Sequence, residues 1–382
     1  MLIAVIGGKL QGLEVVYLAQ KVGWKTIVID KNPHAPAALL CDQFLEFEFT
    51  LEHPMPLNFP AVDIIFPAIE DVEVLTSVKI WAEMKNIPLA FDLNAYKISN
   101  SKLDSDALFK KMNFPTPKPW PDCQFPIVIK PDQESGSQGV EVFNNSKAFN
   151  ARFPNRLSLI NMVIQQYLEG PSYSIEVAGH PGKYQALYVT DLVMDKIYDC
   201  KSVTAPTKLS WDQIKIFKEM AIAIAQELHL TGIMDVEVIL NNSELKLLEI
   251  DARFPSQTPL TVYWATGINM VEILVNLFLN KKYVGCEQKY EHFVVVEHIR
   301  VSGADIEVCG EHIMAQQGHL TLRSDFFGAS EAITSFVPCN GFKGQKLWVA
   351  TLIFAGNSHE DVTIKRNNCH EQIRQATISY QF

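Results

Sequence analysis

Residues 232–259, GIMDVEVILNNSELKLLEIDARFPSQTP, say most about the fold and the chemistry of this chain. Two apolar runs, MDVEVIL and LKLLEID, are joined by NNSE, a turn-rich link that is typical of an antiparallel hairpin. Successive side chains of a strand point to opposite faces, so Asp235 shares a face with Glu237, and Glu249 shares one with Asp251. Pairing of the strands should bring Glu237 beside Glu249, with Asp251 one step along. The stretch therefore predicts a sheet that carries a group of carboxylates on one face.

This group of carboxylates needs a counter-charge. Like charges directly across a hairpin are destabilising, and hard oxygen ligands select Mg²⁺, which usually takes one or two carboxylates together with substrate phosphates. The alternative is a solvated face of an edge hairpin. The aliphatic opposite face and Arg253, two residues after Asp251, favour the metal site, together with the motifs below. We expect Glu237, Glu249 and Asp251 to bind Mg²⁺, with Asp235 as a further candidate.

A lysine and a glycine loop suggest a nucleotide site. Lys130 ends the apolar strand FPIVIK, and the polar loop QESGSQGV follows shortly after it. Gly136 and Gly139 free the backbone to fold over phosphates, and Ser135 and Ser137 add hydroxyl donors. The loop is not a Walker P-loop, because G-x-x-x-x-G-K-[ST] is absent. A surface hairpin is the alternative for the loop alone.

Two further segments fit the same site. Lys102 lies in YKISNSKLDSDALF, just before an expected helix, and a solvated lysine is its alternative. The run VIQQYLEG ends an apolar strand whose backbone can hydrogen-bond an adenine edge, and an ordinary interdomain crossover is the alternative there. We expect the hinge of this run to consist of Gln165, Gln166, Tyr167 and Leu168.

The N-terminus reads as a β-α-β unit over residues 2–30, with GGKLQG at its first turn. A nicotinamide-dependent oxidoreductase begins in this way, and Asp30 at the end of the second strand fits that alternative. The dinucleotide fingerprint G-x-G-x-x-G, however, needs a middle glycine for close approach to the pyrophosphate. Aligned on Gly7 and Gly12, the chain has Lys9 at this position. The steric reason for binding a dinucleotide is therefore missing.

Composition limits the class of protein. A chain of 382 residues predicts two or three structural units. Its net charge of -10 argues against unspecific nucleic-acid binding. Seven scattered cysteines without C-x-x-C indicate a reducing cytoplasm. The start lacks a signal-peptide pattern, and no apolar run approaches the roughly 18 residues of a membrane span. We expect a soluble cytoplasmic protein without membrane contact, with a helix over 211–228 and a strand-rich tail from about residue 293.

Taken in order, these motifs resemble the ATP-grasp superfamily of carboxylate–amine ligases. Within it, GGKLQG, DKNP, AYKIS, GIMDVE, EIDARFPSQTP and GIN look like the 3-methylornithine–L-lysine ligases of pyrrolysine biosynthesis, over residues 1 to about 275. The resemblance implies an α/β (α+β) fold: a Rossmann-like pre-ATP-grasp domain (1–92), then an ATP-grasp fold with its nucleotide between two antiparallel sheets. That fold would comprise a small lid subdomain (93–168) and a large subdomain (169–382) carrying the metal site and the tail.

The resemblance also implies the reaction. ATP and Mg²⁺ would convert a substrate carboxylate into an acylphosphate, which an amine then attacks. Lys102 and Lys130 would contact phosphates, and Arg253 would stabilise the transferred phosphoryl group. In the narrower family the carboxylate is (3R)-3-methyl-D-ornithine and the nucleophile is the ε-amine of L-lysine. A ligase for another amino acid pair is the alternative within the superfamily, and a homodimer is common there.

Further residues are candidates for the small-molecule substrates. Ser256, Gln257 and Thr258 would line the carboxylate pocket, while the turn residues Lys9, Leu10 and Gln11 would contact lysine or nucleotide phosphates. The ammonium groups require acidic partners, for which Glu70 and Glu176 are candidates and Asp199 is a further one. The alternatives are a carboxylate at a helix N-terminus for Glu70 and an ordinary strand residue for Glu176. Asp30 is assigned with Lys9 to nucleotide binding.

Overall fold

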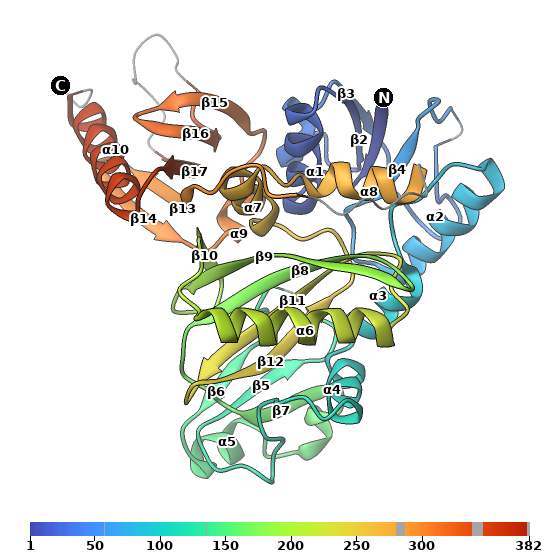
Figure 1. The fold of residues 1–382 in the computed structure, drawn as a ribbon, viewed down its shortest axis with the longest axis vertical. Helices are drawn as coiled ribbons and strands as arrows, with labels where there is room; N and C mark the ends of the chain where they lie inside the picture. Colours follow the sequence, from blue (N-terminus) through green and yellow to red (C-terminus); the bar gives the residue numbers. More distant parts are fainter. Residues whose placement is uncertain (57, 135, 280–286, 338–346, 380–382) are drawn as a thin grey trace.

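The computed structural model describes the chain in five ranges: 1–56, 58–134, 136–279, 287–337 and 347–379. Over these ranges the strands form a four-stranded, a three-stranded and a ten-stranded sheet. Figure 1 shows the four-stranded sheet at the upper right, the three-stranded sheet at the bottom, and the large sheet running from the centre to the upper left. One parallel sheet followed by two antiparallel sheets confirms the expected fold class.

The N-terminal sheet is built from apolar runs. Its neighbouring strands are all parallel, in the order β3 (Gln43–Glu46), β2 (Lys25–Asp30), β1 (Leu2–Ile6) and β4 (Ile64–Pro67). Parallel strands covered on both faces read as continuous apolar runs, and β1 is fully buried over its last four residues. The accompanying helices are α1 (Leu10–Lys21), the 3-10 helix η1 (Pro36–Leu39) and α2 (Val72–Lys85). The carboxyl ends of β1, β2 and β4 thereby place the Gly7–Gly12 turn, Asp30 and Glu70 at one edge.

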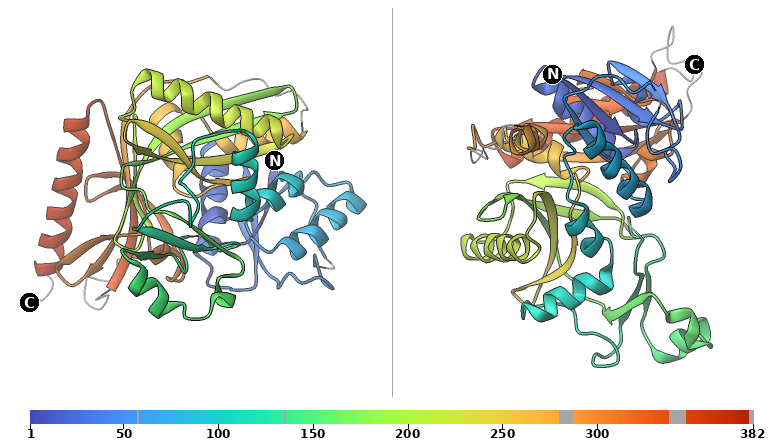
Figure 2. Two further views of the ribbon diagram at one scale, coloured as in Figure 1. Left: turned by 90° about the horizontal axis from the view of Figure 1, so that it is seen from below. Right: turned by 90° about the vertical axis from the view of Figure 1, so that its right-hand side faces the viewer.

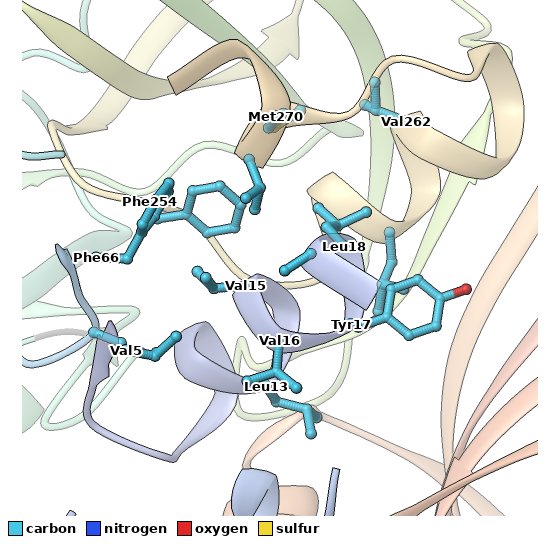
Figure 3. Packing of buried hydrophobic residues seen from close by; sticks show 14 of the residues in the cluster. Val5, Leu13, Val15, Val16, Tyr17, Leu18, Phe66, Phe254, Val262 and Met270 are labelled. Carbon is cyan, nitrogen blue, oxygen red and sulfur yellow. The ribbon is translucent and has the colours of Figure 1, made fainter. Parts of the chain in front are cut away.

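Helix α1 also packs against α7 (Thr258–Thr266) and α8 (Met270–Leu279), which follow the carboxylate hairpin in sequence. Figure 3 shows Val15 and Leu18 of α1 in one cluster with Phe254, Val262 and Met270. All five side chains are buried, and burial of such side chains contributes about 1.5–3 kcal/mol each. This shared core fixes the N-terminal sheet beside the FPSQTP segment.

The three-stranded sheet is antiparallel, in the order β6 (Glu141–Phe143), β5 (Ile127–Pro131) and β7 (Met162–Gln166). Nearby helices are α3 (Leu93–Ser99), α4 (Lys102–Lys111), α5 (Ser146–Arg152) and the 3-10 helix η2 (Arg156–Leu159). Phe149 of α5 makes edge-on or tilted ring contacts with Trp120, Phe125, Phe143 and Phe153. This satellite core is separate from that of the rest of the molecule, and Figure 2 shows the unit projecting from the body.

The large sheet is antiparallel throughout. From its hairpin edge its first strands are β12 (Glu244–Asp251), β11 (Gly232–Asn241), β8 (Ser172–His180), β9 (Lys183–Met194) and β10 (Cys200–Ala205). The predicted hairpin is confirmed, and Asn242 and Ser243 of its turn have positive φ angles of 50° and 66°. Helix α6 (Trp211–Glu227) covers one face of β8 and β9 and matches the expected helix closely. The carboxylates lie on the opposite face of this sheet.

The same sheet continues into the C-terminal part. Its remaining strands are β13 (Phe293–Ser302), β14 (Asp305–Cys309), β15 (Thr321–Phe326), β16 (Ala329–Thr334) and β17 (Leu347–Gly356). The expected strand-rich tail is confirmed, but α9 (His312–Ala315) and the long α10 (His359–Ser379) were not predicted. Helix α10 was not predicted because its sequence is polar and few of its apolar residues are buried. No single helix of the described chain is long and apolar enough to cross a membrane; α7 and α8 pass that test only as a pair bent by 97°.

Candidate active site

The carboxylates lie across three neighbouring strands of the large sheet. Two rows of polar side chains cross β8, β11 and β12 in register: Glu176, Asp235 and Asp251 in one row, and Ser174, Glu237 and Glu249 in the next. The predicted pairing of Glu237 with Glu249 is confirmed. Strand β8 contributes a third member to each row, which the hairpin sequence alone did not indicate. Asp235 hydrogen-bonds the Ser174 hydroxyl and thereby links the rows.

Burial makes this group of carboxylates difficult to ionise. It raises the pKa of Asp235 to about 6, of Asp251 to about 7 and of Glu176 to about 8, and raises that of Glu237 well above the usual range. Neighbouring carboxylates add to the effect in each case, because like charges disfavour ionisation. Arg253 opposes it at Asp251. The face therefore has a deficit of positive charge, which a bound cation would relieve.

The residues fit Mg²⁺ through this charge deficit and through their oxygen donors. Within the described residues no three His, Cys, Asp or Glu side chains are already gathered around one metal position. Mg²⁺ does not require such a cage, because it is held by one or two carboxylates together with substrate phosphates. Glu237 and Glu249 face each other on adjacent strands, and Asp251 has one oxygen without a hydrogen-bond partner in the described structure. The donor set suits a metal that arrives with a nucleotide.

A cavity of about 390 Å³ lies between the three-stranded sheet and the large sheet. It is lined by residues of both sheets and the glycine loop, including Lys102, Lys130, Gly136, Ser137, Gln165, Gln166, Tyr167, Leu168, Glu237 and Glu249. The structure thus brings the predicted lysines, hinge and two metal candidates together. Ser135 lies outside the described residues. Gly139 is not part of this wall as described; it forms a turn with φ of 71° against Pro131.

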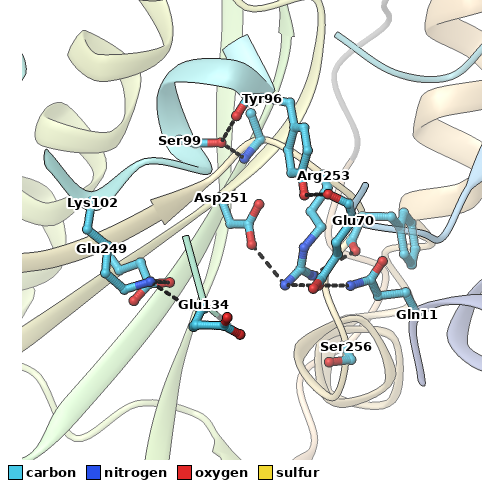
Figure 4. A network of polar contacts seen from close by, with 12 residues as sticks. Gln11, Glu70, Tyr96, Ser99, Lys102, Glu134, Glu249, Asp251, Arg253 and Ser256 are labelled. Carbon is cyan, nitrogen blue, oxygen red and sulfur yellow. Dashed lines mark hydrogen bonds and ion pairs between the residues drawn. The ribbon is translucent and has the colours of Figure 1, made fainter. Parts of the chain in front are cut away.

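The two lysines are held in different ways. Ser101 caps α4, so Lys102 is the first residue of that helix. Its ammonium lies 3.5 Å from a Glu249 oxygen and donates to the Glu134 carbonyl at 2.6 Å, as Figure 4 shows. Burial lowers the pKa of Lys130, although Glu249 opposes the effect. A polyanion entering this cavity would compensate the lysine charge and leave Glu249 free for a metal.

A second cavity, of about 480 Å³, opens at the edge of the N-terminal sheet. Its lining includes the predicted residues Lys9, Leu10, Gln11, Asp30, Glu70, Gly136, Arg253 and Ser256. Asp30 accepts the Gly8 amide at 2.7 Å, so it also supports the glycine turn. Glu70 does not cap α2, because Asp71 accepts the Glu73 and Val74 amides. Glu70 nevertheless directly precedes the N-cap of α2, so a favourable interaction with the helix dipole stays an alternative, and its side chain also lines the cavity.

Arg253 connects the two halves of the site. Its guanidinium lies 2.8 Å from Asp251 and 3.0 Å from Glu70, while Gln11 donates to the same Glu70 oxygen at 2.8 Å. Figure 4 shows this chain of contacts running from β12 to the N-terminal turn. The pairing holds the pKa of Arg253 above its usual value despite burial. A permanent cation is thus fixed where the second cavity meets the carboxylate rows.

A third cavity, of about 160 Å³, lies between the carboxylate rows and the start of α7. Ser256, Gln257 and Thr258 line it, as does Arg253. Gln257 has a φ of 66°, and its side-chain oxygen is buried without a hydrogen-bond partner in the described chain. The buried Glu14 of α1 holds this strained turn by accepting the amides of Gln257 and Leu260 at 3.0 and 3.1 Å.

Glu176 lies beside this cavity without being part of its described wall. The side chain is fully buried, and the Thr258 hydroxyl beside it opposes the rise of its pKa without offsetting burial. A buried carboxylate without a cationic partner costs free energy unless it is protonated or meets a cation. This burial favours a ligand role for Glu176, which stays a prediction.

The structure also adds residues that the sequence did not reveal. Glu311 lines both the second and the third cavity, and its carboxylate accepts from Ser256 at 3.1 Å. His312 lines the second cavity and contacts Asp199, which lines the third. Glu14 was hidden in an apolar helix. Glu311 and His312 lie in a segment without a recognisable motif, so only three-dimensional proximity could identify them.

Comparisons with known proteins show the family of the chain. Residues 99–257 match the family model described as ATP-grasp domain. The chain is 34% identical to 3-methyl-D-ornithine–L-lysine ligase of Methanosarcina mazei, covering 96% of this chain and 93% of that protein. It is 34% identical to the ligase of the same name from Methanosarcina acetivorans, covering 95% of each. Among solved structures, an L-amino acid ligase from Bacillus licheniformis superposes with a TM-score of 0.67 at 16% identity, covering 97% of both chains.

A sheet-bounded cavity with two lysines, a glycine loop and paired carboxylates defines an ATP-grasp enzyme, an ADP-forming ligase that makes carbon–nitrogen bonds. Full-length similarity at 34% identity assigns it more narrowly. The chain belongs to the family of the 3-methyl-D-ornithine–L-lysine ligases. The nicotinamide-dependent alternative is therefore wrong.

Proposed function

We propose that this chain joins the carboxylate of (3R)-3-methyl-D-ornithine to the ε-amine of L-lysine, with conversion of ATP to ADP and phosphate, in pyrrolysine biosynthesis. The observation that carries the proposal is the similarity to ligases of this name over nearly the whole of both chains. The chemistry of the cleft supports it, because both substrates carry ammonium groups and the cleft is rich in buried carboxylates.

ATP occupies the first cavity in this proposal. Lys102, Lys130 and the glycine loop hold its phosphates, and the hinge Gln165–Leu168 faces the adenine. The three-stranded sheet then acts as the lid, within the range 93–168, and the large subdomain of 169–382 provides the floor. The size of the cavity, about 390 Å³, supports this assignment because ligand pockets commonly have about 300–1,000 Å³.

Glu237, Glu249 and Asp251 would hold Mg²⁺, with Asp235 in support. The metal would neutralise phosphate charge and orient the γ-phosphoryl group. The contribution of the chain is to present oxygen ligands on two rigid strands, so that little reorganisation is needed when nucleotide and metal arrive.

The amino acid substrates occupy the other two cavities. Glu70, supported by Gln11, would hold an ammonium group of lysine beside the N-terminal turn, with Leu10 and Lys9 along the wall. Glu176 would meet an ammonium group of the ornithine derivative, while Ser256, Gln257 and Thr258 line the pocket around it. The third cavity is small, which supports one compact amino acid there.

The reaction then proceeds in two steps across Arg253. The substrate carboxylate attacks the γ-phosphorus of ATP, giving an acylphosphate and ADP. The amine next attacks the acyl carbon, a C–N bond forms, and the C–O bond to phosphate breaks. Arg253 stabilises the charge that develops on the transferred phosphoryl group and on the tetrahedral intermediate. The enzyme acts by positioning and charge neutralisation, and no protein nucleophile is required.

A coupled assay of ADP release tests the proposal. 3-Methyl-D-ornithine and L-lysine together should give ADP in proportion to an amide product that mass spectrometry identifies, and D-ornithine should replace the methylated substrate. Release of ADP with another amino acid pair, but not with either of these, would assign the chain to a different reaction of the superfamily.

A further inference from the structure

A histidine–aspartate pair lies at the junction of the cavities. His312 has no role in the proposed reaction, and Asp199 was expected from the sequence only as a further candidate to hold an ammonium group. The Nδ1 atom of His312 is 2.9 Å from Oδ1 of Asp199, and the His312 amide donates to the other Asp199 oxygen at 3.3 Å. Asp199 is itself oriented, because its amide donates to Asp195 at 3.0 Å. A carboxylate on Nδ1 selects the tautomer with a proton on Nδ1 and leaves Nε2 as the acceptor.

The free edge of the imidazole faces the glycine loop. A side-chain carbon at position 136 would lie 2.3 Å from both Nε2 and Cε1 of His312. Gly136 lines all three cavities, and His312 lines the second one together with Glu70 and Arg253. The Nε2 edge therefore lies beside the proposed lysine cavity. Arg253, the cation that would stabilise the transferred phosphoryl group, lines the same cavity.

The second step of the proposed reaction requires a base. Lysine enters as an ammonium ion, which has no lone pair and cannot attack the acyl carbon. Two protons must leave nitrogen before the amide is formed. Among the residues assigned to the lysine cavity none is suited to accept them, since Lys9 and Arg253 are cations, Leu10 and Gln11 carry no basic group, and Glu70 is already bonded to Arg253 and Gln11.

We propose that His312 is the general base of the amine-attack step and that Asp199 is its positioning residue; this inference rests on the proposed function. Nε2 takes the first proton from the ε-ammonium group as the nitrogen lone pair forms the C–N bond. The C–O bond to phosphate then breaks, and the leaving phosphate takes the second proton. The products are the amide, hydrogen phosphate and a protonated His312, which returns its proton to solvent.

The charges around the ring suit this role. The hydrogen bond with Asp199 has the largest effect on the pKa of His312 and raises it. The charges of Asp199, Glu311 and Glu70 raise it further, and burial opposes them. His298 on β13 also neighbours the ring, and burial lowers its pKa to about 4, so it stays neutral, while the cation Arg253 lines the same cavity. An imidazole with three acidic neighbours is a stronger base than a free one, which helps it compete for an ammonium proton.

A second role for the pair must be distinguished. Ser137 of the glycine loop donates to the Tyr198 carbonyl at 2.6 Å, and Gly136 lies against His312, so the pair could act only as a support for this loop. The two roles differ in which nucleophiles they affect. Support of the loop serves both steps with any nucleophile, whereas a general base matters only for a nucleophile that arrives protonated.

Hydroxylamine distinguishes the two roles, because it is uncharged at neutral pH and attacks acylphosphates directly. A general base is therefore not needed to deprotonate it before the attack. The experiment compares His312→Asn, His312→Gln and Asp199→Asn with wild type, using D-ornithine and ATP with either L-lysine or hydroxylamine. His180→Asn, at the distant β8–β9 turn, is the matched control. We expect amide formation with lysine to fall by about 10²–10⁴-fold. Hydroxamate formation should stay near the wild-type rate, and the fall with lysine should lessen as pH rises.

Equal losses with both nucleophiles would overturn the proposal in favour of loop support, and wild-type rates with lysine would overturn it outright. Asp199→Asn leaves the ring in place and carries the same test if the His312 variants do not fold. Wild-type protein that forms no hydroxamate from D-ornithine would instead refute the proposed function, and with it this inference. Thus the two failures are distinguishable.

Discussion

Replacing Glu249 by glutamine should make the ligand-free protein more stable and abolish its ligase activity. Glu249 lies directly opposite Glu237 across the hairpin. Two unit charges about 5 Å apart repel by about 3 kcal/mol at an effective dielectric constant of about 20. Lys102, 3.5 Å away, and a side chain that is 34% exposed offset most of this repulsion. Glu237 relieves the rest in part by taking up a proton, as its raised pKa indicates.

The remaining cost is that of an ordinary cross-strand pair of like charges, about 0.2–1 kcal/mol. Glu249→Gln keeps the shape of the side chain and removes this cost, so the melting temperature without ligands should rise by up to about 1 °C. Turnover should fall at least about 10³-fold, equivalent to about 4 kcal/mol, because one of two facing metal ligands loses its charge. Stability and activity should therefore change in opposite directions.

Thermal unfolding in EDTA and coupled ADP release in Mg²⁺ measure the two effects. Glu244→Gln is the matched control, because Glu244 starts the same strand, is 54% exposed and pairs with Lys246 at 3.2 Å. This control should change neither quantity by more than about 0.5 kcal/mol. A lower melting temperature for Glu249→Gln, or turnover like that of wild type, would refute the reasoning about this pair.

Three further predictions concern other parts of the molecule. Arg253→Met should lower kcat by about 10²–10³-fold. Arg253→Lys should retain only part of the wild-type kcat, because lysine lacks the planar fork that reaches two carboxylates. Steady-state ADP release measures both variants. Glu176→Gln should raise KM for the ornithine substrate while changing the free energy of unfolding little, because a carboxyl with a pKa of about 8 is mostly protonated at pH 7; an unchanged KM contradicts its role. Glu297→Gln should cost about 3–5 kcal/mol in urea unfolding, with normal activity of the folded fraction, because this buried carboxylate lies 2.6 Å from His370 and 2.7 Å from Arg366. Burial raises the pKa of Glu297, but these two partners outweigh burial and hold the pKa below its usual value. The stabilisation by Glu297 therefore exists above about pH 4.3 and is lost in stronger acid. The stabilities of variant and wild type should converge there.

Much of the site could be predicted from the sequence because its signals are local. The strand period of two fixes which face each side chain occupies, so the alternation in residues 232–251 was enough to pair Glu237 with Glu249. The glycines of the loop and Pro131 before it likewise decide which backbone conformations are allowed, because glycine permits positive φ angles and proline fixes φ. Such features depend on a few neighbouring residues and need no knowledge of the rest of the fold.

Contacts between distant segments were decided by the tertiary structure alone. Glu14 reaches Gln257 across 243 residues, and Asp199 reaches His312 across 113. The pairing of Glu70 with Arg253 depends in the same way on how α1 packs against α7 and α8. These contacts follow from burial of a shared apolar surface, which is non-directional and leaves no periodic mark in the sequence. The sequence by itself thus determined the strands, the carboxylate faces and the family, whereas the docking of the N-terminal sheet decided which polar groups share one cleft.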